Sequence, residues 1–280
     1  MKFGITGASG HLGQLVAAGL TTEVDPREVV LITRTPDALR AQPGTTVRLG
    51  DFSRPDTLDH AFAEIETLLL ISTDAVGVRL EQQRAAIAAA VRAGVGRILY
   101  TSVPNPVASN PAFVVPDHAG TEAALRESGV QWVTLRNNLY AHMQLPGIQR
   151  AAAVGRFVVN QGEGRAGYVT REDCAAVAVA AMLQSGHENR AYDVTGPEAV
   201  GAADLAVLAG DQVEVVSVTD DEYIAGLVAA NLSESLARGL ASFGAGIREG
   251  YFAAVTNVVH DLTGRPATSL TTLLGLTALN

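Results

Sequence analysis

Short runs of apolar and β-branched residues alternate with segments of helical periodicity through the first half of the chain. Strands are predicted at Lys2 to Thr6, Val29 to Thr33, Thr46 to Leu49, Thr67 to Ser72, Arg97 to Thr101 and Gln131 to Arg136. Helices are predicted between them, at His11 to Leu20, Asp56 to Ala63, Val78 to Ala93 and Gly120 to Glu127. Nearly unbroken apolar strands are typical of sheets covered on both faces. The alternation therefore predicts an α/β fold with a doubly wound parallel sheet of the Rossmann type.

Beyond residue 136 the alternation is less regular. Strands are expected at Gly155 to Val159 and Ala191 to Val194, with a helix from Arg171 to Leu183 that Thr170 caps. The stretch from Asp220 to Phe252 has Ala, Leu and Ser at helical spacing. We therefore expect a Rossmann domain over residues 1–150, late elements of it within 155–195, and a smaller α/β C-terminal domain over 196–280.

Composition restricts the classes of partner. The formal net charge is -9, and Lys and Arg do not cluster into the basic stripe that nucleic-acid binding needs, so we expect no nucleic-acid partner. No run of about 18 apolar residues occurs, which predicts no membrane span. The N-terminus lacks the pattern of a signal peptide, and Cys174 is the sole cysteine, so a cytoplasmic location is expected. The six histidines have no close ligand spacing, and no metal site is expected.

A glycine-rich loop joins the first predicted strand to the first predicted helix. Gly7, Gly10 and Gly13 form a G-x-x-G-x-x-G run there. Glycine lets the backbone turn tightly and approach a pyrophosphate, while the helix N-terminus offers unpaired N–H groups to the phosphates. The placement favours dinucleotide binding over a turn that merely uses glycines.

The residue that follows the second strand distinguishes between the two nicotinamide cofactors. Sites for NAD usually place an acidic residue there for the ribose hydroxyl, whereas an arginine accommodates the 2′-phosphate of NADP. This chain has Arg34 at that point, and the alternative is a solvated surface arginine. The sequence predicts NADP(H).

Polar side chains follow three other strands, at the sheet edge where open α/β folds bind ligands. Asp51 and Phe52 follow the third strand, where they could contact adenine, although Asp51 is equally well explained as a turn residue. Ser72 and Thr73 follow the fourth strand, and Thr101 and Ser102 follow the fifth.

The segments GASGHLG, LITRTP, GDF, LLLIS, YTS, LRNNLY and LTGRP, in this order, resemble the atypical short-chain dehydrogenase/reductase group related to NmrA. Within it the chain is most similar to the branch of NADPH-dependent quinone oxidoreductase type 2 and triphenylmethane reductase. That resemblance implies a Rossmann domain, a small C-terminal domain and a substrate cleft between them. It also implies a small-molecule substrate and allows for a homodimer.

The resemblance assigns roles to particular residues. The loop Gly7, Ala8, Ser9, Gly10, His11 and Leu12 would hold the pyrophosphate, Arg34 the 2′-phosphate, and Ser72 and Thr73 would lie along the cofactor toward the nicotinamide. Asn138 and Tyr140 would lie beside the nicotinamide, and Arg171 matches an arginine of the same branch.

Typical short-chain dehydrogenases use a tyrosine and a lysine four residues apart, and the sequence contains no Y-x-x-x-K. Its corresponding stretch has His118 and Glu122, as in this branch. His118 and Tyr140 are the candidate catalytic proton donors, with a structural His118–Glu122 pair as the alternative for the histidine. These features predict a reductase that transfers hydride from NADPH to an electrophilic acceptor such as a quinone or a cationic dye. The alternative is a non-catalytic NADP-binding redox sensor.

Overall fold

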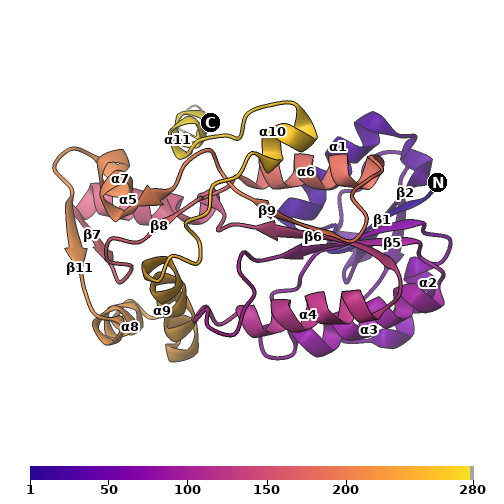
Figure 1. The fold of residues 1–280 in the computed structure, drawn as a ribbon, viewed down its shortest axis with the longest axis horizontal. Helices are drawn as coiled ribbons and strands as arrows, with labels where there is room; N and C mark the ends of the chain where they lie inside the picture. Colours follow the sequence, from indigo (N-terminus) through magenta and orange to yellow (C-terminus); the bar gives the residue numbers. More distant parts are fainter. Residues whose placement is uncertain (278–280) are drawn as a thin grey trace.

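A seven-stranded parallel sheet forms the centre of the larger of two lobes (Figure 1). The computed structural model describes residues 1–277. The strand order is β3-β2-β1-β4-β5-β6-β9, and neighbouring strands are parallel throughout. Their bounds are Phe3–Ile5 (β1), Val29–Thr33 (β2), Thr46–Leu49 (β3), Thr67–Leu70 (β4), Arg97–Ser102 (β5), Gln131–Asn137 (β6) and Arg190–Val194 (β9). The predicted Rossmann-type fold is confirmed, and each predicted strand is present.

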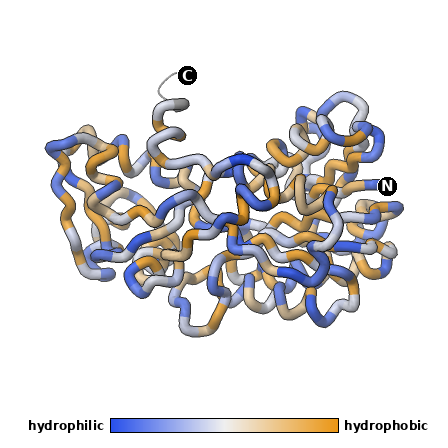
Figure 2. Tube along the Cα trace, turned by 45° about the horizontal axis from the view of Figure 1, so that its top comes forward, coloured by the Kyte–Doolittle hydropathy of each residue, from blue (hydrophilic) through white to orange (hydrophobic). Residues whose placement is uncertain are grey.

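Helices cover both faces of this sheet. On one face lie α1 (His11–Glu23), α6 (Arg171–Leu183) and α10 (Val258–Thr263), and on the other lie α2 (Leu58–Phe62), α3 (Arg79–Arg92) and α4 (Val115–Glu127) (Figure 1). Apolar side chains of the strands alternate between the two resulting cores, so Ile5 and Leu31 pack beneath α1 while Val30 and Ile32 pack on the other side. Hydrophobic segments accordingly run through the interior (Figure 2). Short 3₁₀ turns at Pro26–Glu28, Pro36–Ala38, Pro55–Thr57 and Ala141–Met143 complete the connections.

Helix α4 begins at Val115, five residues before its predicted start at Gly120. Pro116 lies in its first turn, where proline is well tolerated because the amide it lacks would have no intrahelical partner there. The longer helix places His118 one turn inside α4 rather than in the preceding loop.

The smaller lobe lies beyond the carboxyl ends of β5 and β6 (Figure 1). It contains α5 (Leu145–Val154), α7 (Ala202–Ala209), α8 (Asp220–Ala229), α9 (Glu234–Arg248) and two two-stranded sheets. One sheet pairs β7 (Arg156–Val159) with β11 (Glu214–Ser217), and the other pairs β8 (Arg165–Ala166) with β10 (Val200–Gly201). The final helix, α11 (Leu270–Thr277), packs Leu270 and Leu273 into the core of the same lobe.

The chain therefore crosses between the lobes more often than a boundary at residue 196 implies. The predicted strand near Gly155 to Val159 exists as β7, but it pairs within the smaller lobe and not with the Rossmann sheet. In the opposite direction, α10 returns to the larger lobe, where Val259 joins the core beneath α6. Only β9 and α6 of the 155–195 segment belong to the Rossmann sheet and its helices.

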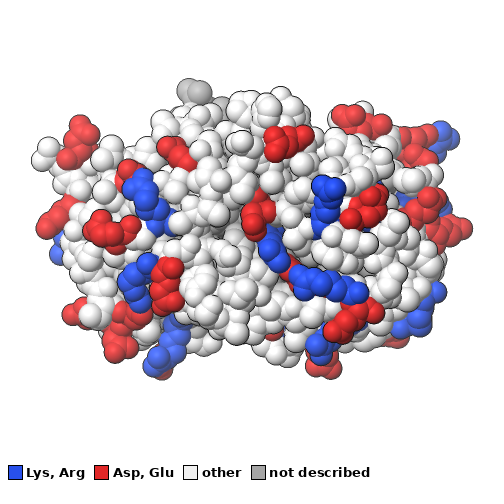
Figure 3. Space-filling model, viewed as in Figure 1, with Lys and Arg blue, Asp and Glu red and all other residues white. Residues whose placement is uncertain are grey.

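Charged side chains of both signs are interspersed over the face in Figure 3. Among residues 1–277, no helix is long and apolar enough to cross a membrane. Within the same range, no group of three or more His, Cys, Asp or Glu side chains is arranged to hold a metal ion.

Candidate functional site: a groove at the strand crossover

The order in which the chain adds strands to the sheet reverses between β1 and β4. The chain runs outward from β1 to β2 and β3, returns to β4 beside β1, and then continues to β5 and β6 on the other side. The connections diverge at this point and leave a crevice outside the carboxyl ends of the two strands, which is where open α/β sheets bind ligands. A groove of about 260 Å³ lies here, lined by residues that follow β1, β2, β3 and β4.

The glycine loop forms the middle of the groove. Gly7 has φ +61°, a left-handed conformation that favours glycine. The Gly10 amide donates to the Gly7 carbonyl at 2.9 Å and closes a turn. A Cβ on Gly13 would lie 2.8 Å from Ala8 Cα and would also meet the Gly7 carbonyl, so the helix can approach the loop only with glycine there. Gly10 is the N-cap of α1, and because glycine has no side chain it cannot accept from the first amides of the helix. The first amides of α1 are thus left to a ligand, and the loop fits a pyrophosphate.

The end of the groove at β2 and β3 carries Arg34, Asp51 and Phe52. Arg34 is exposed at the mouth, where its guanidinium can meet a phosphate. Asp51 Oδ1 accepts hydrogen bonds from the amide and the hydroxyl of Ser53 at 2.9 and 2.7 Å, which is the turn role left open by the sequence. Partial burial would raise the pKa of Asp51, but these two bonds, with help from Arg34, hold it below its usual value.

The other end of the groove follows β4. Ser72, Thr73 and Asp74 line it, together with Gln82 from α3. Thr73 Oγ1 donates to Gln82 Oε1 at 3.3 Å, so this hydrogen bond leaves the amide nitrogen of Gln82 as a donor. Gln82 and Thr33, whose hydroxyl lies 3.0 Å from that of Ser9, are lining residues that sequence reasoning missed.

Three further loop residues lie as predicted around the glycine turn, but outside the lining of the groove. Ala8 is buried and its amide donates to Ile32 O at 3.1 Å, which ties the loop to β2. His11 is exposed at the first position of α1, and Leu12 is buried in the core beneath that helix. The backbone amides of His11 and Leu12, rather than their side chains, are the groups that remain for a ligand.

His118 is buried, and both of its ring nitrogens contact side chains of the protein. Its Nδ1 lies 2.7 Å from the hydroxyl of Tyr100, and its Nε2 lies 3.2 Å from Nη1 of Arg79. Because arginine only donates, Nε2 accepts, and the proton of the neutral ring is on Nδ1. Burial, together with the neighbouring Arg79, lowers the pKa of His118 to about 3, so the ring is neutral at ordinary pH. This geometry favours a structural role for His118, because both ring nitrogens are bonded within the chain, and its role as a proton donor stays a prediction.

The alternative prediction, a structural His118–Glu122 pair, differs from the contacts of these two described residues, which have separate partners. Glu122 is buried and accepts from Ser102, Arg126 and Arg136 at 2.6 to 2.9 Å. Two guanidinium groups compensate this buried carboxylate, so it joins α4 to β5 and β6 while His118 joins α4 to α3.

Asn138, Tyr140 and Arg171 lie at the junction of the two lobes, outside the groove lining. Asn138 is buried, and its amide donates to Phe252 O at 2.9 Å while its oxygen accepts from the Leu139 amide at 2.8 Å. Each end of the side chain makes a hydrogen bond within the chain, so Asn138 joins the exit of β6 to the segment after α9. Its predicted contact with the cofactor stays a prediction.

Tyr140 lies beneath Arg171, whose guanidinium carbon is 5.3 Å from the ring centroid. Burial raises the pKa of the Tyr140 phenol above its ordinary value, so the hydroxyl keeps its proton through neutral pH. The phenol is held loosely, since its hydrogen bond with Asn137 Nδ2 is 3.5 Å long. Arg171 thus contacts Tyr140 rather than the groove, and Tyr140 remains a candidate proton donor.

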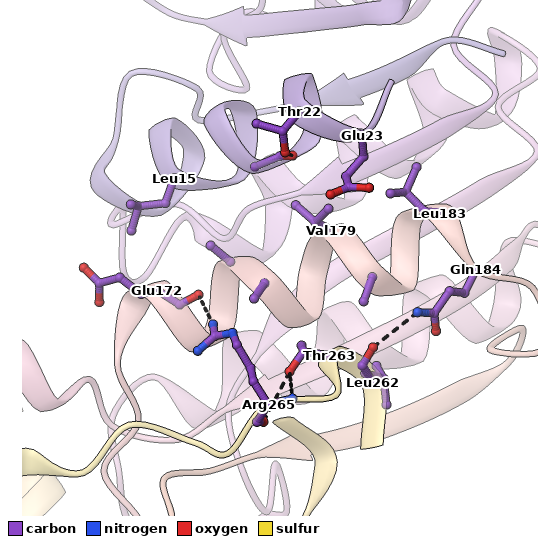
Figure 4. A pocket seen from close by; sticks show the side chains of 14 residues that line it. Leu15, Thr22, Glu23, Glu172, Val179, Leu183, Gln184, Leu262, Thr263 and Arg265 are labelled. Atoms are coloured by element: carbon purple, nitrogen blue, oxygen red, sulfur yellow. Dashed lines mark hydrogen bonds between the residues drawn. The ribbon is translucent and has the colours of Figure 1, made fainter. Parts of the chain in front are cut away.

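A second hollow of about 490 Å³ lies on the outer side of α1, α6 and α10 (Figure 4). Its wall is largely aliphatic, with Leu15, Val179 and Leu183, and Arg265 at its edge donates to Asp173 at 2.8 Å. Although it is larger than the groove, it lies on the helices and away from the carboxyl ends of the strands, where open α/β sheets bind ligands. We assign the functional site to the groove.

The fold and the groove define the class: a Rossmann-type protein with a cradle for a dinucleotide. Residues 7–185 match the model of a family described as NAD(P)H-binding, and the chain belongs to this family. The resemblance to NmrA-like reductases is confirmed, because a quinone oxidoreductase 2 and a triphenylmethane reductase are among the proteins similar to this chain.

Two curated relatives match over nearly their whole length. Quinone oxidoreductase 2 of Escherichia coli (strain K12) is 35% identical over 273 residues, covering 95% of each chain. The NAD(P)H azoreductase of Xenophilus azovorans is 28% identical over 271 residues, covering 94% of this chain and 93% of that one.

Solved structures agree with the fold. The complex of an NADPH-dependent quinone oxidoreductase from Escherichia coli with NADPH has a TM-score of 0.92 at 34% identity, covering 99% of this chain and 100% of that one. Triphenylmethane reductase from Citrobacter sp. with NADP(H) has a TM-score of 0.91 at 28% identity, covering 99% of both chains.

Proposed function

We propose that this protein is an NADPH-dependent reductase that transfers hydride to an electrophilic small molecule such as a quinone or a cationic dye. The observation that carries the proposal is the groove itself, which combines an uncapped helix N-terminus behind a glycine loop with Arg34 at one end. The similarity to quinone oxidoreductase 2 over 95% of the chain supports the same reaction class.

The two ends of the groove suit the two halves of the cofactor. Arg34 would bind the 2′-phosphate, Phe52 would flank the adenine, and the amides of His11 and Leu12 at the start of α1 would hold the pyrophosphate. Ser72 and Thr73, with the amide of Gln82, would bind the nicotinamide half. NADPH supplies the hydride, and the protein aligns it with the acceptor and keeps water away.

The acceptor proposed for this site needs little acid–base help. Lys2 is the sole lysine of the sequence, and it precedes β1 at the amino end of the strand, where it is paired with Glu64 at 2.5 Å. The Tyr–Lys pair of typical short-chain dehydrogenases therefore has no counterpart that could act at the groove. A cationic dye needs only the hydride to become neutral, whereas a quinone needs the hydride and one proton, which Tyr140 or water would supply.

The decisive test is turnover of NADPH with a panel that contains benzoquinone and a cationic triphenylmethane dye. Oxidation of NADPH coupled to loss of either acceptor is the expected result. Tight NADPH binding without turnover across the panel would refute the reductase and favour an NADP-binding redox sensor. Failure to bind NADPH would refute both functions.

A further inference from the structure

Strand β4 ends two residues earlier than its sequence predicts. The apolar run continues to Ser72, but the strand ends at Leu70. The next two amides, of Ile71 and Ser72, donate to threonine side chains on the two neighbouring strands instead of to backbone carbonyls. The two threonine hydroxyls thus take the place of the backbone carbonyls as hydrogen-bond acceptors, at the point where the chain passes from β4 into the groove.

Thr6 holds the exit from the β1 side. Its side chain is buried, and Oγ1 accepts from Ile71 N at 2.9 Å while it donates to Leu69 O at 3.1 Å. One hydroxyl therefore bridges the last ladder carbonyl and the first amide beyond it. Ile71 lies beside the glycine loop, since a Cβ on Gly7 would be in van der Waals contact with Ile71 Cβ at 3.5 Å.

Thr101 holds the exit from the β5 side. It is buried at the end of that strand, and its Oγ1 accepts from Ser72 N at 2.9 Å. The same hydroxyl donates to Ser72 Oγ at 3.3 Å. Both the backbone and the side chain of Ser72, which lines the groove, are thus oriented by one buried residue that does not itself line it.

We propose that Thr6 and Thr101 are positioning residues that fix the exit of β4 in the geometry required by the nicotinamide half of NADPH. The inference rests on the proposed function, since it assumes that NADPH occupies the groove. A partly buried amide that loses its acceptor must shift to find another or remain unsatisfied, so removing either hydroxyl displaces the groove wall. We expect the displacement to be largest at Ser72 and smallest at the Arg34 end, which follows a different strand.

The test uses the near-isosteric variants Thr6→Val and Thr101→Val with two probes, NADPH and adenosine 2′,5′-bisphosphate. The bisphosphate carries the groups for the Arg34 end but lacks the nicotinamide half. We expect about a tenfold rise in the Kd of NADPH for each variant, and less than about a twofold change for the bisphosphate. In turnover the same variants should raise KM for NADPH more than they lower kcat.

A matched control is Thr134→Val in β6. Thr134 is equally buried in the same sheet, but its hydroxyl has no hydrogen-bond partner among the described residues. Its replacement should leave both Kd values unchanged. Thr101→Ser keeps the hydroxyl and should restore NADPH binding to within about threefold of the wild type.

Amide hydrogen exchange tests the same contact without a variant, should Thr101→Val fail to fold. The Ser72 and Ile71 amides should be protected in the protein without cofactor. Rapid exchange there until NADPH is added would overturn the inference, as would equal weakening of NADPH and bisphosphate binding in the valine variants. If the wild type binds the bisphosphate but not NADPH, or neither probe, the proposed function fails first, which separates the two failures.

Discussion

The groove at the strand crossover and the junction of the two lobes use their polar groups in opposite ways. Asn138 and Tyr140 lie at this junction, and so does the start of α4 with His118, since Val115 of that helix packs into the core of the smaller lobe. In the groove, the first amides of α1 behind the glycine loop and the guanidinium of Arg34 are left for a ligand. At the junction, His118 and Asn138 make two hydrogen bonds each within the chain. The difference shows that a polar residue near a cleft is a binding residue only where the fold leaves its hydrogen bonds unmade.

The largest effect is expected from the glycine that brings helix and loop together. Gly13→Ala places a Cβ 2.8 Å from Ala8 Cα, which is backbone and cannot rotate away. We expect a loss of about 2 to 3 kcal/mol in the free energy of unfolding, measured in urea, and loss of NADPH binding. The control is Gly226→Ala in α8, where a Cβ would meet nothing within 4 Å and should stabilise the helix by about 0.5 to 1 kcal/mol. Retained NADPH affinity in Gly13→Ala would show that the loop is only a turn.

The Arg34 side chain provides the next largest effect. Arg34→Ala removes a charged donor and should weaken NADPH binding by about 10- to 100-fold while changing NADH binding less than about threefold. Isothermal titration with both cofactors measures the ratio. Arg54→Ala is the matched control, because Arg54 is a nearby exposed arginine that lies 3.6 Å from Asp56. An equal loss for NADPH and NADH would contradict the role assigned to Arg34.

The sequence was sufficient for the groove because its parts are local. A strand, a glycine run and a helix follow one another at Phe3 to Glu23, and the strand-end positions of Arg34 and Ser72 can be read from short apolar runs. Parallel strands bring these ends to one edge of the sheet whatever the details of their helices. The fold class and most groove residues were therefore predictable.

The junction was not predictable for the converse reason. The partners of His118 are Arg79 and Tyr100, which come from α3 and β5, and no spacing along the chain indicates that these side chains meet. Gln82 reaches the groove only because α3 returns past the exit of β4. Likewise β7 has the pattern of any short strand, and only the packing of the smaller lobe decides that it pairs with β11.

The buried histidine predicts a pH dependence of stability and not of catalysis. Its pKa is about 3 in the folded protein against an ordinary value of about 6.5, so between these values the unfolded chain binds the extra proton. Stability from this group is fully present above about pH 6.5 and falls as the pH is lowered. Between pH 7 and pH 5, the free energy of unfolding measured in urea should fall by about 2 kcal/mol more for the wild type than for His118→Gln.

Glutamine can accept from Arg79 and donate to Tyr100, so the variant keeps the polar contacts without the titration. Turnover of His118→Gln should show the same pH profile near pH 6.5 as the wild type. An acid loss of stability that is identical in both proteins, or a profile that loses an ionisation near pH 6.5, would restore His118 as a candidate proton donor.

The smallest effect is expected at Tyr140, whose hydroxyl makes only a long hydrogen bond. Tyr140→Phe removes a 3.5 Å hydrogen bond and should change the free energy of unfolding by less than about 0.5 kcal/mol. If the phenol supplies the proton, kcat for benzoquinone should fall by about tenfold, less than a typical general acid because water can substitute. Reduction of a cationic dye takes up hydride without a proton and should be unaffected, so it serves as the internal control. Equal losses with both acceptors would mean that Tyr140 shapes the pocket, and no loss with either would assign the proton to water.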